Sequence, residues 1–583
     1  MDRAAGLLDQ GRHREHTVGD AGVASTTAMG STAPGTALIV GVTSHRDLDP
    51  ALLPALRGQI RDALAGLCAQ FPSLSLALLS PLAEGGDRLA AEVALELGGQ
   101  LIVPLPMPVE LYEEDFQAPG SRAEFGRLLA RAQVIGLPVA AADVDALRTP
   151  GARRDQRYLL GGLFVANHCH VLLALWDGGD NGGTGGTAEV VRYYLGGPLP
   201  GARRAGDNLR QMLAGDDDSL VLHLPARRAS SRGKVDETLH PAWITSTARR
   251  PLAAGMPPEY RRIFERMEAF EEDRRALPGV AHATPQEPAD AISRTVDAMA
   301  VRFQRRTTWA TRTIHGLAVL MGMAFLLYSD LGAPDSMLWV FLALFVTGAL
   351  VVAVAHRRDW HRKYIDYRAL AEGLRVQAYW RRAGLTMTGD PEFAHDNFLQ
   401  KQDVELGWIR NVMRQVGLMP MPAIDDEARA VDAVVDAWVG RPGRSGQLDY
   451  YERNAALHER HHRRTRALGS ACLWGGIGIS LFLALFHRGL GDLARDLLVT
   501  TMGTLSLLAA VREAYAYRKA DKELVKQYRF MHRIYRNARL ALDAARGTRE
   551  RREILRALGE AALAEHAEWA LMHRLRPIEH GRP

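Results

Sequence analysis

The distribution of hydrophobic residues divides the chain into two halves of different character. In the first half, short apolar runs alternate with amphipathic stretches, which is typical of strands alternating with helices in an open parallel sheet. The expected strands are 38–42, 74–79, 101–105, 171–176 and 220–224, and the expected helices are 52–67, 87–97, 122–132 and 187–195. The pattern predicts a doubly wound α/β domain over residues 36–225, with right-handed crossovers.

Four long apolar runs dominate the second half. They occupy residues 313–329, 336–355, 467–486 and 497–513, and each approaches the roughly 20 residues that a helix needs to cross a bilayer. Shifting the first pair of runs by 161 residues places it on the second pair, and places Tyr367-Arg368 on Tyr528-Arg529. We therefore predict an all-α membrane region of two repeats, residues 289–425 and 426–583, with four transmembrane helices.

Basic residues flank both hairpins at the ends away from their short connecting loops. The loop of the first hairpin carries Asp330 and Asp335 and no base, and that of the second is neutral. Lys and Arg near span ends mark the cytoplasmic side, so the repeats are expected to be parallel in the inner membrane, with both termini and the α/β domain in the cytoplasm. The flanking bases are Arg302, Arg305, Arg306, Arg312, Arg357, Arg358, Arg362 and Lys363, then Arg460, Arg463, Arg464, Arg466, Arg512, Arg518, Lys519 and Lys522.

Composition narrows the function classes. The net charge is only +5 and the bases gather near the apolar runs, which favours lipid headgroups over nucleic acid as a partner. Cys68, Cys169 and Cys472 lie far apart, as expected of reduced thiols rather than a disulfide framework or a metal site. Residues 1–35, rich in small residues, are expected to be a disordered tail, and 226–288 a linker with one charged helix.

Three loops are expected at the carboxyl ends of strands, where open α/β sheets bind ligands. Their glycines allow backbone N–H groups to approach a phosphate, and the helix that follows favours negative charge. Arginines in the first two loops can add charge-assisted hydrogen bonds. The sequence therefore predicts a nucleotide-derived ligand, and no other cofactor. The candidate residues are Thr43, Ser44, His45 and Arg46; Glu84, Gly85, Gly86, Asp87 and Arg88; and Gly182, Gly183, Gly185, Gly186, Thr187 and Glu189.

These loops resemble a known superfamily. Residues 41–46, 80–87, 105–108 and 174–189 are similar to the SLOG superfamily of Rossmann-like domains, which sense or process nucleotides, although Ser44 stands where glycine is expected. Residues 364–380, 450–464 and 523–535 resemble SLATT modules, in which two membrane helices precede a cytosolic helix. The resemblance implies a nucleotide sensor fused to two effector modules of a kind that permeabilises membranes in bacterial conflict and antiviral defence.

The resemblance also raises an enzymatic alternative. Hydrolase members of the superfamily carry a Gly-Gly-x-Gly-Thr-x-x-Glu loop and an arginine on the preceding helix. Here the glutamate is Glu189, two residues after Thr187 instead of three, and the arginine position is Gly161, with Arg157 one turn earlier. Glu189 and Arg157 are therefore candidates for catalysis, but Glu189 also fits a first-turn helix acid or a ribose-binding residue.

The leading hypothesis is a nucleotide-gated, pore-forming homo-oligomer that does not bind nucleic acid directly. The alternatives are a membrane-tethered phosphoribohydrolase acting on a nucleoside monophosphate, and a ligand-tuned ion channel or signalling scaffold. Arg512 and Glu513 fall at repeat positions that lie inside the second span. Either they are a functional charged pair inside the membrane, or the short fourth span ends just before them.

Overall fold

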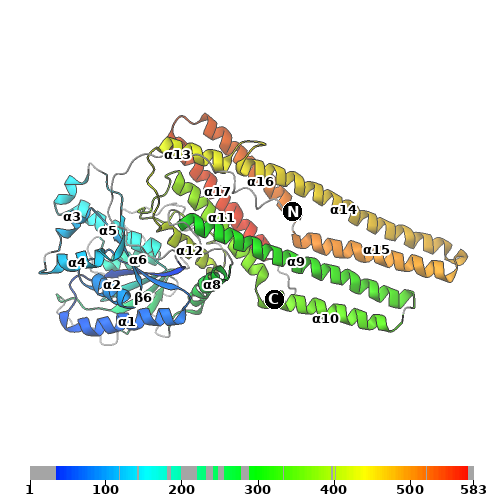
Figure 1. Cartoon of the computed structure of the whole chain (residues 1–583), viewed down its shortest axis with the longest axis horizontal. Coiled ribbons are helices and arrows are strands. Elements are labelled where there is room, and N and C mark those ends of the chain that lie inside the picture. Colours follow the sequence, from blue (N-terminus) through cyan, green and yellow to red (C-terminus); the bar gives the residue numbers. More distant parts are fainter. Residues whose placement is uncertain are drawn as a thin grey trace.

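A computed structural model describes residues 35–575, apart from 117, 141–142, 180–184, 198–218, 231–239, 247–254, 278–287, 333, 396–397, 401 and 520. An α/β domain occupies one end of the molecule, a group of packed helices the middle, and two long helical hairpins the other end (Figure 1). The expected fold class, a mainly parallel sheet followed by an all-helical region of two repeats, is confirmed.

The sheet has seven strands in the order β4-β3-β2-β1-β5-β6-β7. Its first six strands run parallel, and only β7 is antiparallel to its neighbour β6. The chain moves outward from β1 to β4 and then returns to β5 on the other side of β1, so the topological switch point lies between β1 and β5. The strands are β1 (Ala37–Ser44), β2 (Ser75–Leu79), β3 (Gln100–Leu105), β4 (Ala132–Gly136), β5 (Val171–Trp176), β6 (Leu220–Pro225) and β7 (Ala242–Thr245).

Alternate residues of the strands face opposite layers of helices. In β1, Leu38 and Val40 share a core with the first helices, whereas Ala37 and Ile39 pack with the helices that flank β5. Both faces are covered, which explains why the central strands are continuous apolar runs. The first layer contains α1 (Leu53–Gln70), α2 (Gly86–Glu96), α3 (Val109–Glu113) and α4 (Ser121–Leu129), and the second α5 (Ala152–His168) and α6 (Thr187–Tyr194).

Two strands were not expected from the sequence. β4 is an edge strand in which only Ile135 is buried, so its hydrophobic signal is weak. β7 has four residues and lies in the segment expected to be a linker. The helix α8 (Pro258–Arg275) in that segment buries Ile263, Phe264 and Met267 in the same core as α1. The segment therefore completes the α/β domain and is more than a connection.

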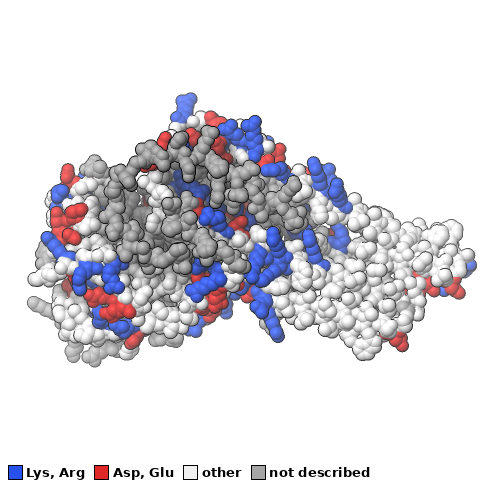
Figure 2. All heavy atoms as spheres, viewed as in Figure 1, with Lys and Arg blue, Asp and Glu red and all other residues white. Residues whose placement is uncertain are grey.

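The second half consists of two modules built alike. The first module contains α9 (Pro288–Asp330), α10 (Ser336–Arg357) and α11 (Trp360–Arg382), and the second α14 (Gly446–Phe486), α15 (Asp492–Lys519) and α16 (Asp521–Ala544). Among the residues that the structure describes, four helices are long and apolar enough to cross a membrane. The two hairpins project in the same direction (Figure 1), as parallel repeats require. Lys and Arg gather where the hairpins meet the rest of the molecule (Figure 2).

The first helix of each module continues without a break from the packed helices into the hairpin. α9 has 43 residues, which corresponds to about 65 Å at ~1.5 Å per residue and is about twice the thickness of the bilayer core. Its first part buries Ile292, Val296, Met299 and Phe303. One continuous helix therefore joins the packed helical body to the first candidate span.

The two hairpins meet through reciprocal glycine–leucine contacts. The space beside Gly322 on α9 is filled by Leu507 of α15, and the space beside Gly503 on α15 is filled by Leu326 of α9. In the same antiparallel register, the rings of His315 and Tyr515 lie 5.2 Å apart. Small residues that admit a partner side chain are the usual means of close helix packing in membranes.

The remaining helices, α12 (Gly407–Gly417), α13 (Glu427–Val434) and α17 (Thr548–Arg574), complete the helical body. The α/β domain is fixed to this body at the amino ends of β1 and β5. The Ala37 N–H donates to Gln415 of α12 at 3.0 Å, and the His170 ring bonds the Asn411 carbonyl at 3.0 Å. Thr36 donates to the buried carboxylate of Glu271 on α8. The carboxyl ends of the strands lie at the opposite edge.

Candidate functional site

The first two predicted loops are in contact at the carboxyl ends of β1 and β2. The Gly86 N–H donates to the His45 carbonyl at 3.4 Å. A Cβ at Gly85 would lie 2.5 Å from the Arg46 carbonyl oxygen, and one at Gly86 would lie 2.6 Å from the Ser44 Cβ. Gly85 also has a φ of +90°, which favours glycine. Both glycines are therefore needed for the two loops to approach each other.

Asp87 lies at the centre of these loops. Its carboxylate accepts hydrogen bonds from the Ser44 hydroxyl at 2.6 Å and the Ser80 hydroxyl at 3.3 Å, and the residue is 3% exposed. Burial raises the pKa of Asp87 to about 6, against the two hydroxyl donors that lower it. Ser44, the departure from the expected glycine, thus provides a hydrogen bond that glycine lacks.

Arg46 and His45 lie on the two sides of the first loop. Arg46 is exposed, and its guanidinium lies 4.7 Å from the centre of the Tyr158 ring. His45 is buried, and its Nε2 accepts from the Asp177 N–H at 3.2 Å and from Arg228 Nε at 3.3 Å. Burial and the nearby Arg228 lower the pKa of His45, although Asp177 opposes this. The histidine therefore holds loops together as a neutral ring, while Arg46 keeps its charge at the surface.

The third loop packs on α5. A Cβ at Gly185 would lie 2.8 Å from the Leu159 backbone nitrogen. The Glu189 carboxylate turns back and accepts from the Gly185 N–H at 2.7 Å. Thr187 is buried at the start of α6. Gly182 and Gly183, predicted in the same loop, lie outside the described residues.

Two predicted arginines are bound to the protein itself. Arg157 donates to three backbone carbonyls, those of Pro106 at 2.6 Å, Pro138 at 3.0 Å and Leu137 at 3.2 Å. Arg88 is 2% exposed and donates to the Leu82 carbonyl and to Ser121 and Glu124 of α4, while Glu84 bonds the same Ser121. Arg46 is thus the exposed arginine among the three.

Three contributors to this edge were not predicted: Tyr158, Asp177 and Arg228. Asp177 directly follows β5, so its place at the carboxyl end of a strand was a usable signal. Tyr158 and Arg228 reach the site from α5 and from the segment after β6, and Arg228 lies 3.6 Å from Asp177. Their approach depends on the tertiary fold and has no local sequence signature.

The charged pair of the fourth span lies within continuous helix. α15 runs through Arg512 and Glu513, whose side chains form an ion pair at 2.6 Å. The Arg512 side chain covers Gly469 of α14, with its Cδ 3.1 Å from where a Cβ would be. The pair therefore lies at the α14–α15 crossing. In the described part of the chain, no group of three or more His, Cys, Asp or Glu side chains is placed to hold a metal ion.

Two cavities lie away from the switch point. One of about 310 Å³ lies between α16 and α17, and one of about 570 Å³ lies beside Phe116 and α4. The candidate site itself is an exposed edge with a buried acid, the exposed Arg46 cation and a helix N-terminus. No protein-family model matches the chain, and no curated protein matches it.

Proposed function

We propose that the protein is a nucleotide-sensing membrane effector of the SLOG–SLATT type, which forms a pore or disrupts the inner membrane when its α/β domain binds a nucleotide signal. One observation carries this proposal. Glycine-rich loops meet at the carboxyl ends of the strands, beside the switch point, whereas the amino ends of the strands are fixed to a helical body in which α9 and α14 continue into the membrane spans.

The chemistry of the edge favours an anionic ligand with an aromatic base. Arg46 supplies an exposed cation, and Tyr158 beneath it supplies a ring. The N-terminus of α6 supplies backbone N–H groups, which suit phosphate oxygens. Asp87 is buried below the loops, where it orders Ser44 and Ser80 and does not face the phosphates.

A continuous set of contacts leads from the third loop to the first membrane module. Gly185 packs on Leu159 of α5, and Arg157, two residues earlier, binds the carbonyls that follow β3 and β4. Gly136 at the end of β4 lies directly against Gly389, in the connection between α11 and α12. An unbroken set of contacts supports energetic coupling between the ligand loops and the membrane module, but it does not give the size of that coupling. A ligand shifts the equilibrium between a closed and an open arrangement of the membrane helices only if it binds the open arrangement more tightly.

Four spans enclose little space, so the active form is an oligomer in the bilayer. The hairpins carry large exposed apolar side chains, such as Trp339 at 72% and Trp474 at 69% exposure, which suit lipid or a second copy. Lys and Arg gather where the hairpins meet the rest of the molecule (Figure 2). Because such residues near span ends mark the cytoplasmic side, they favour a cytoplasmic sensor and cytoplasmic termini.

The hydrolase alternative has weaker support from the geometry. The carboxylate of Glu189 is bonded to its own loop, and the Arg157 guanidinium is bonded to three carbonyls. Cleavage of an N-glycosidic bond needs a carboxylate directed at the sugar. Neither candidate side chain is directed at an open position in this arrangement.

Equilibrium dialysis of the detergent-purified protein against linear, cyclic and ribosylated nucleotides tests the proposal, followed by dye leakage from liposomes. We expect one nucleotide to concentrate unchanged on the protein side and to trigger leakage. Arg46→Ala should weaken binding at least tenfold, whereas Arg131→Ala, an exposed arginine at the start of β4, should leave it unchanged. Binding without leakage would favour a signalling scaffold, and release of the free base would favour the hydrolase.

A further inference from the structure

The cavity between α16 and α17 has a lining unlike that of an ordinary helix interface. Each helix contributes four side chains at the spacing i, i+3, i+4 and i+7, which places them on one face. Those of α16 are Glu523, Lys526, Gln527 and Phe530, and those of α17 are Glu565, Glu568, Trp569 and Met572. Two facing stripes at this spacing normally carry apolar residues, but here five of the eight side chains are polar or charged.

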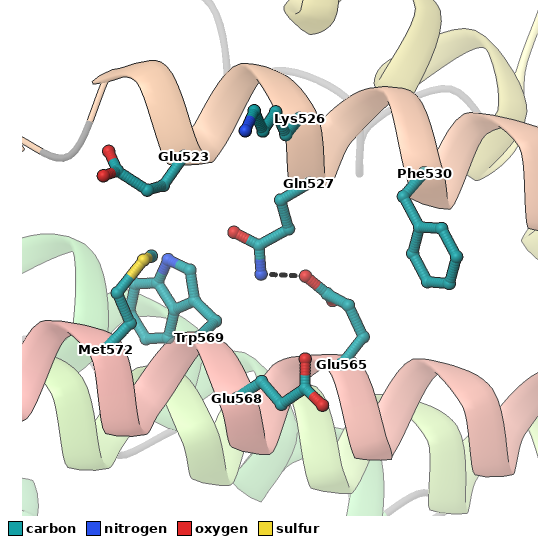
Figure 3. A pocket seen from close by; sticks show the side chains of 8 residues that line it. All are labelled: Glu523, Lys526, Gln527, Phe530, Glu565, Glu568, Trp569 and Met572. Atoms are coloured by element: carbon teal, nitrogen blue, oxygen red, sulfur yellow. Dashed lines mark hydrogen bonds between the residues drawn. The ribbon is translucent and has the colours of Figure 1, made fainter.

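The two stripes line an acidic cleft of about 310 Å³ that is open to solvent, called the chamber below. Gln527 donates its side-chain N–H to Glu565 across the gap (Figure 3). Glu523 lies on α16 to the left of that bond, Glu568 lies on α17 below it, and Trp569 lies between Glu568 and Met572 (Figure 3). Three glutamates and one lysine line it, so acids outnumber the base.

We propose that this chamber binds an alkylammonium group, the cationic end of a polyamine or of an aminophospholipid. Carboxylates accept the ammonium N–H bonds, while Trp569, Phe530 and Met572 offer apolar walls to the adjoining methylene groups. The volume lies at the lower end of the range for small-molecule sites. An anion is repelled by the three carboxylates. A metal ion is disfavoured because these carboxylates do not converge as ligands among the described residues.

An occupied chamber would join the two membrane modules. α17 is already bound to α11 of the first module: Trp569 packs edge-on against Tyr364, Arg574 pairs with Asp366, and Trp380 Nε1 donates to the Leu555 carbonyl at 3.2 Å. α16 belongs to the second module and begins two residues after α15 ends. A ligand that holds α16 to α17 therefore ties the second module to the first, independently of the nucleotide site.

Isothermal titration of the full-length protein with spermidine, in an uncharged detergent, tests the site. We expect saturable binding of one molecule per chain, weakened at least tenfold by Glu565→Gln and by Glu568→Gln. Glu560→Gln, an exposed α17 acid outside the chamber, should bind as the wild type does. Lys526→Met removes the competing ammonium and should strengthen binding several-fold, a gain that misfolding cannot produce.

Native mass spectrometry with added phosphatidylethanolamine or phosphatidylglycerol separates the two sources. Retention of phosphatidylethanolamine by the wild type, but not by Glu565→Gln, identifies a lipid headgroup. Spermidine binding without such retention identifies a soluble amine. The proposal is overturned if neither amine binds saturably, or if the Gln variants bind both as well as the wild type. Glu568 is exposed, so its variant tests the site without a risk to folding.

Discussion

The two membrane modules share a plan but differ in how deeply they are embedded. The third helix of the first module, α11, is packed on several sides and buries residues such as Ile365, Leu370 and Leu374. In the second module, the equivalent helix α16 buries Val525, Met531, Tyr535 and Leu542 among its described residues. Likewise α14 buries four of its 41 residues, where its equivalent α9 buries ten of 43. The first module is therefore part of the rigid body that holds the α/β domain, and the second has fewer restraints against movement.

Repeat-equivalent tyrosines show how the duplicated parts diverged. Tyr367 of α11 donates to Asp273 of α8 at 2.5 Å and so connects the first module to the α/β domain. Its equivalent, Tyr528 of α16, packs against Tyr450 and Tyr451 within the second module. Tyr367 also packs on Phe303 of its own module, so the first copy adds a contact outside the module to the contact inside it. This difference suits a coupling module and a moving module.

The anchoring of α8, the helix through which Tyr367 of the first module is held, should be broken most severely at Glu271. The side chain is fully buried and bonded to Thr36, Arg274 and Arg275, so Glu271→Ala leaves the nearly buried Arg274 cation and the Thr36 donors without this partner and should cost about 3–5 kcal/mol. Hydrogen exchange should show lost protection in β1 and α8 but not in α14 or α15. Glu265→Ala, an exposed acid on the same helix, is the control. An equal loss of protection in α14 and α15 would contradict the difference between the two modules.

Two glutamates near the junction of the modules should respond to pH with opposite signs. Burial raises the pKa of Glu565 to about 7, so its stabilising contribution is present below its ordinary value of 4.5 and is lost as the pH rises through 7. Despite burial, Arg375 and Arg368 lower the pKa of Glu372 to about 2, so its contribution is present above 4.5 and is lost as the pH falls towards 2.

Glu565→Gln should accordingly be more stable than the wild type at pH 8, by roughly 3 kcal/mol for a pKa raised from 4.5 to about 7, with no difference near pH 4. Glu372→Gln should be less stable than the wild type at neutral pH. Melting temperatures measured from pH 4 to 8 in one detergent check both. If the stability difference from the wild type changed with pH in the same way for both variants, the two glutamates would not have pKa values shifted in opposite directions.

Sequence patterns predicted the parts of the fold whose signals are local. β1, β2, β3, β5 and β6 are buried on both faces, so each is an apolar run, and the four spans follow from length and hydropathy alone. β4 and β7 were missed because an edge strand needs little apolar surface, and α8 was read as part of a linker because charged residues outnumber its buried face.

The site was predictable where it depends on strand ends and not where it depends on packing. The meeting of Gly86 with Ser44 follows from the adjacency of β1 and β2 in a parallel sheet. The roles of Arg88 and Arg157 do not follow, because the carbonyls they bind belong to segments more than 15 residues distant in sequence, except for Leu82. Such partners become visible only when the chain is folded.

The contact between the modules should weaken when Gly322 is enlarged. A leucine there collides with Leu507, and overpacking of this kind costs about 1–3 kcal/mol. Gly316 lies on the same helix with no atom within 4 Å of its Cβ position, so Gly316→Leu is a matched control that should be neutral. Crosslinking between cysteines placed on α9 and α15 reports the contact. If both variants lower crosslinking equally, the reciprocal glycines do not define this interface.

A repeated ion pair tests the smallest expected difference between the modules. Each third helix uses an equivalent arginine to bind the first helix of its own module: Arg368 lies 3.8 Å from Asp297, and Arg529 lies 2.6 Å from Glu459. Arg368 also pairs with Glu372 at 2.6 Å and is half-buried, so Arg368→Met should cost about 1–2 kcal/mol. The Arg529 pair has the shorter distance but is exposed to solvent, where screening leaves little net stabilisation. Arg529→Met should therefore leave the melting temperature unchanged, and a larger loss there than at Arg368 would mean that distance, not burial, separates the two modules.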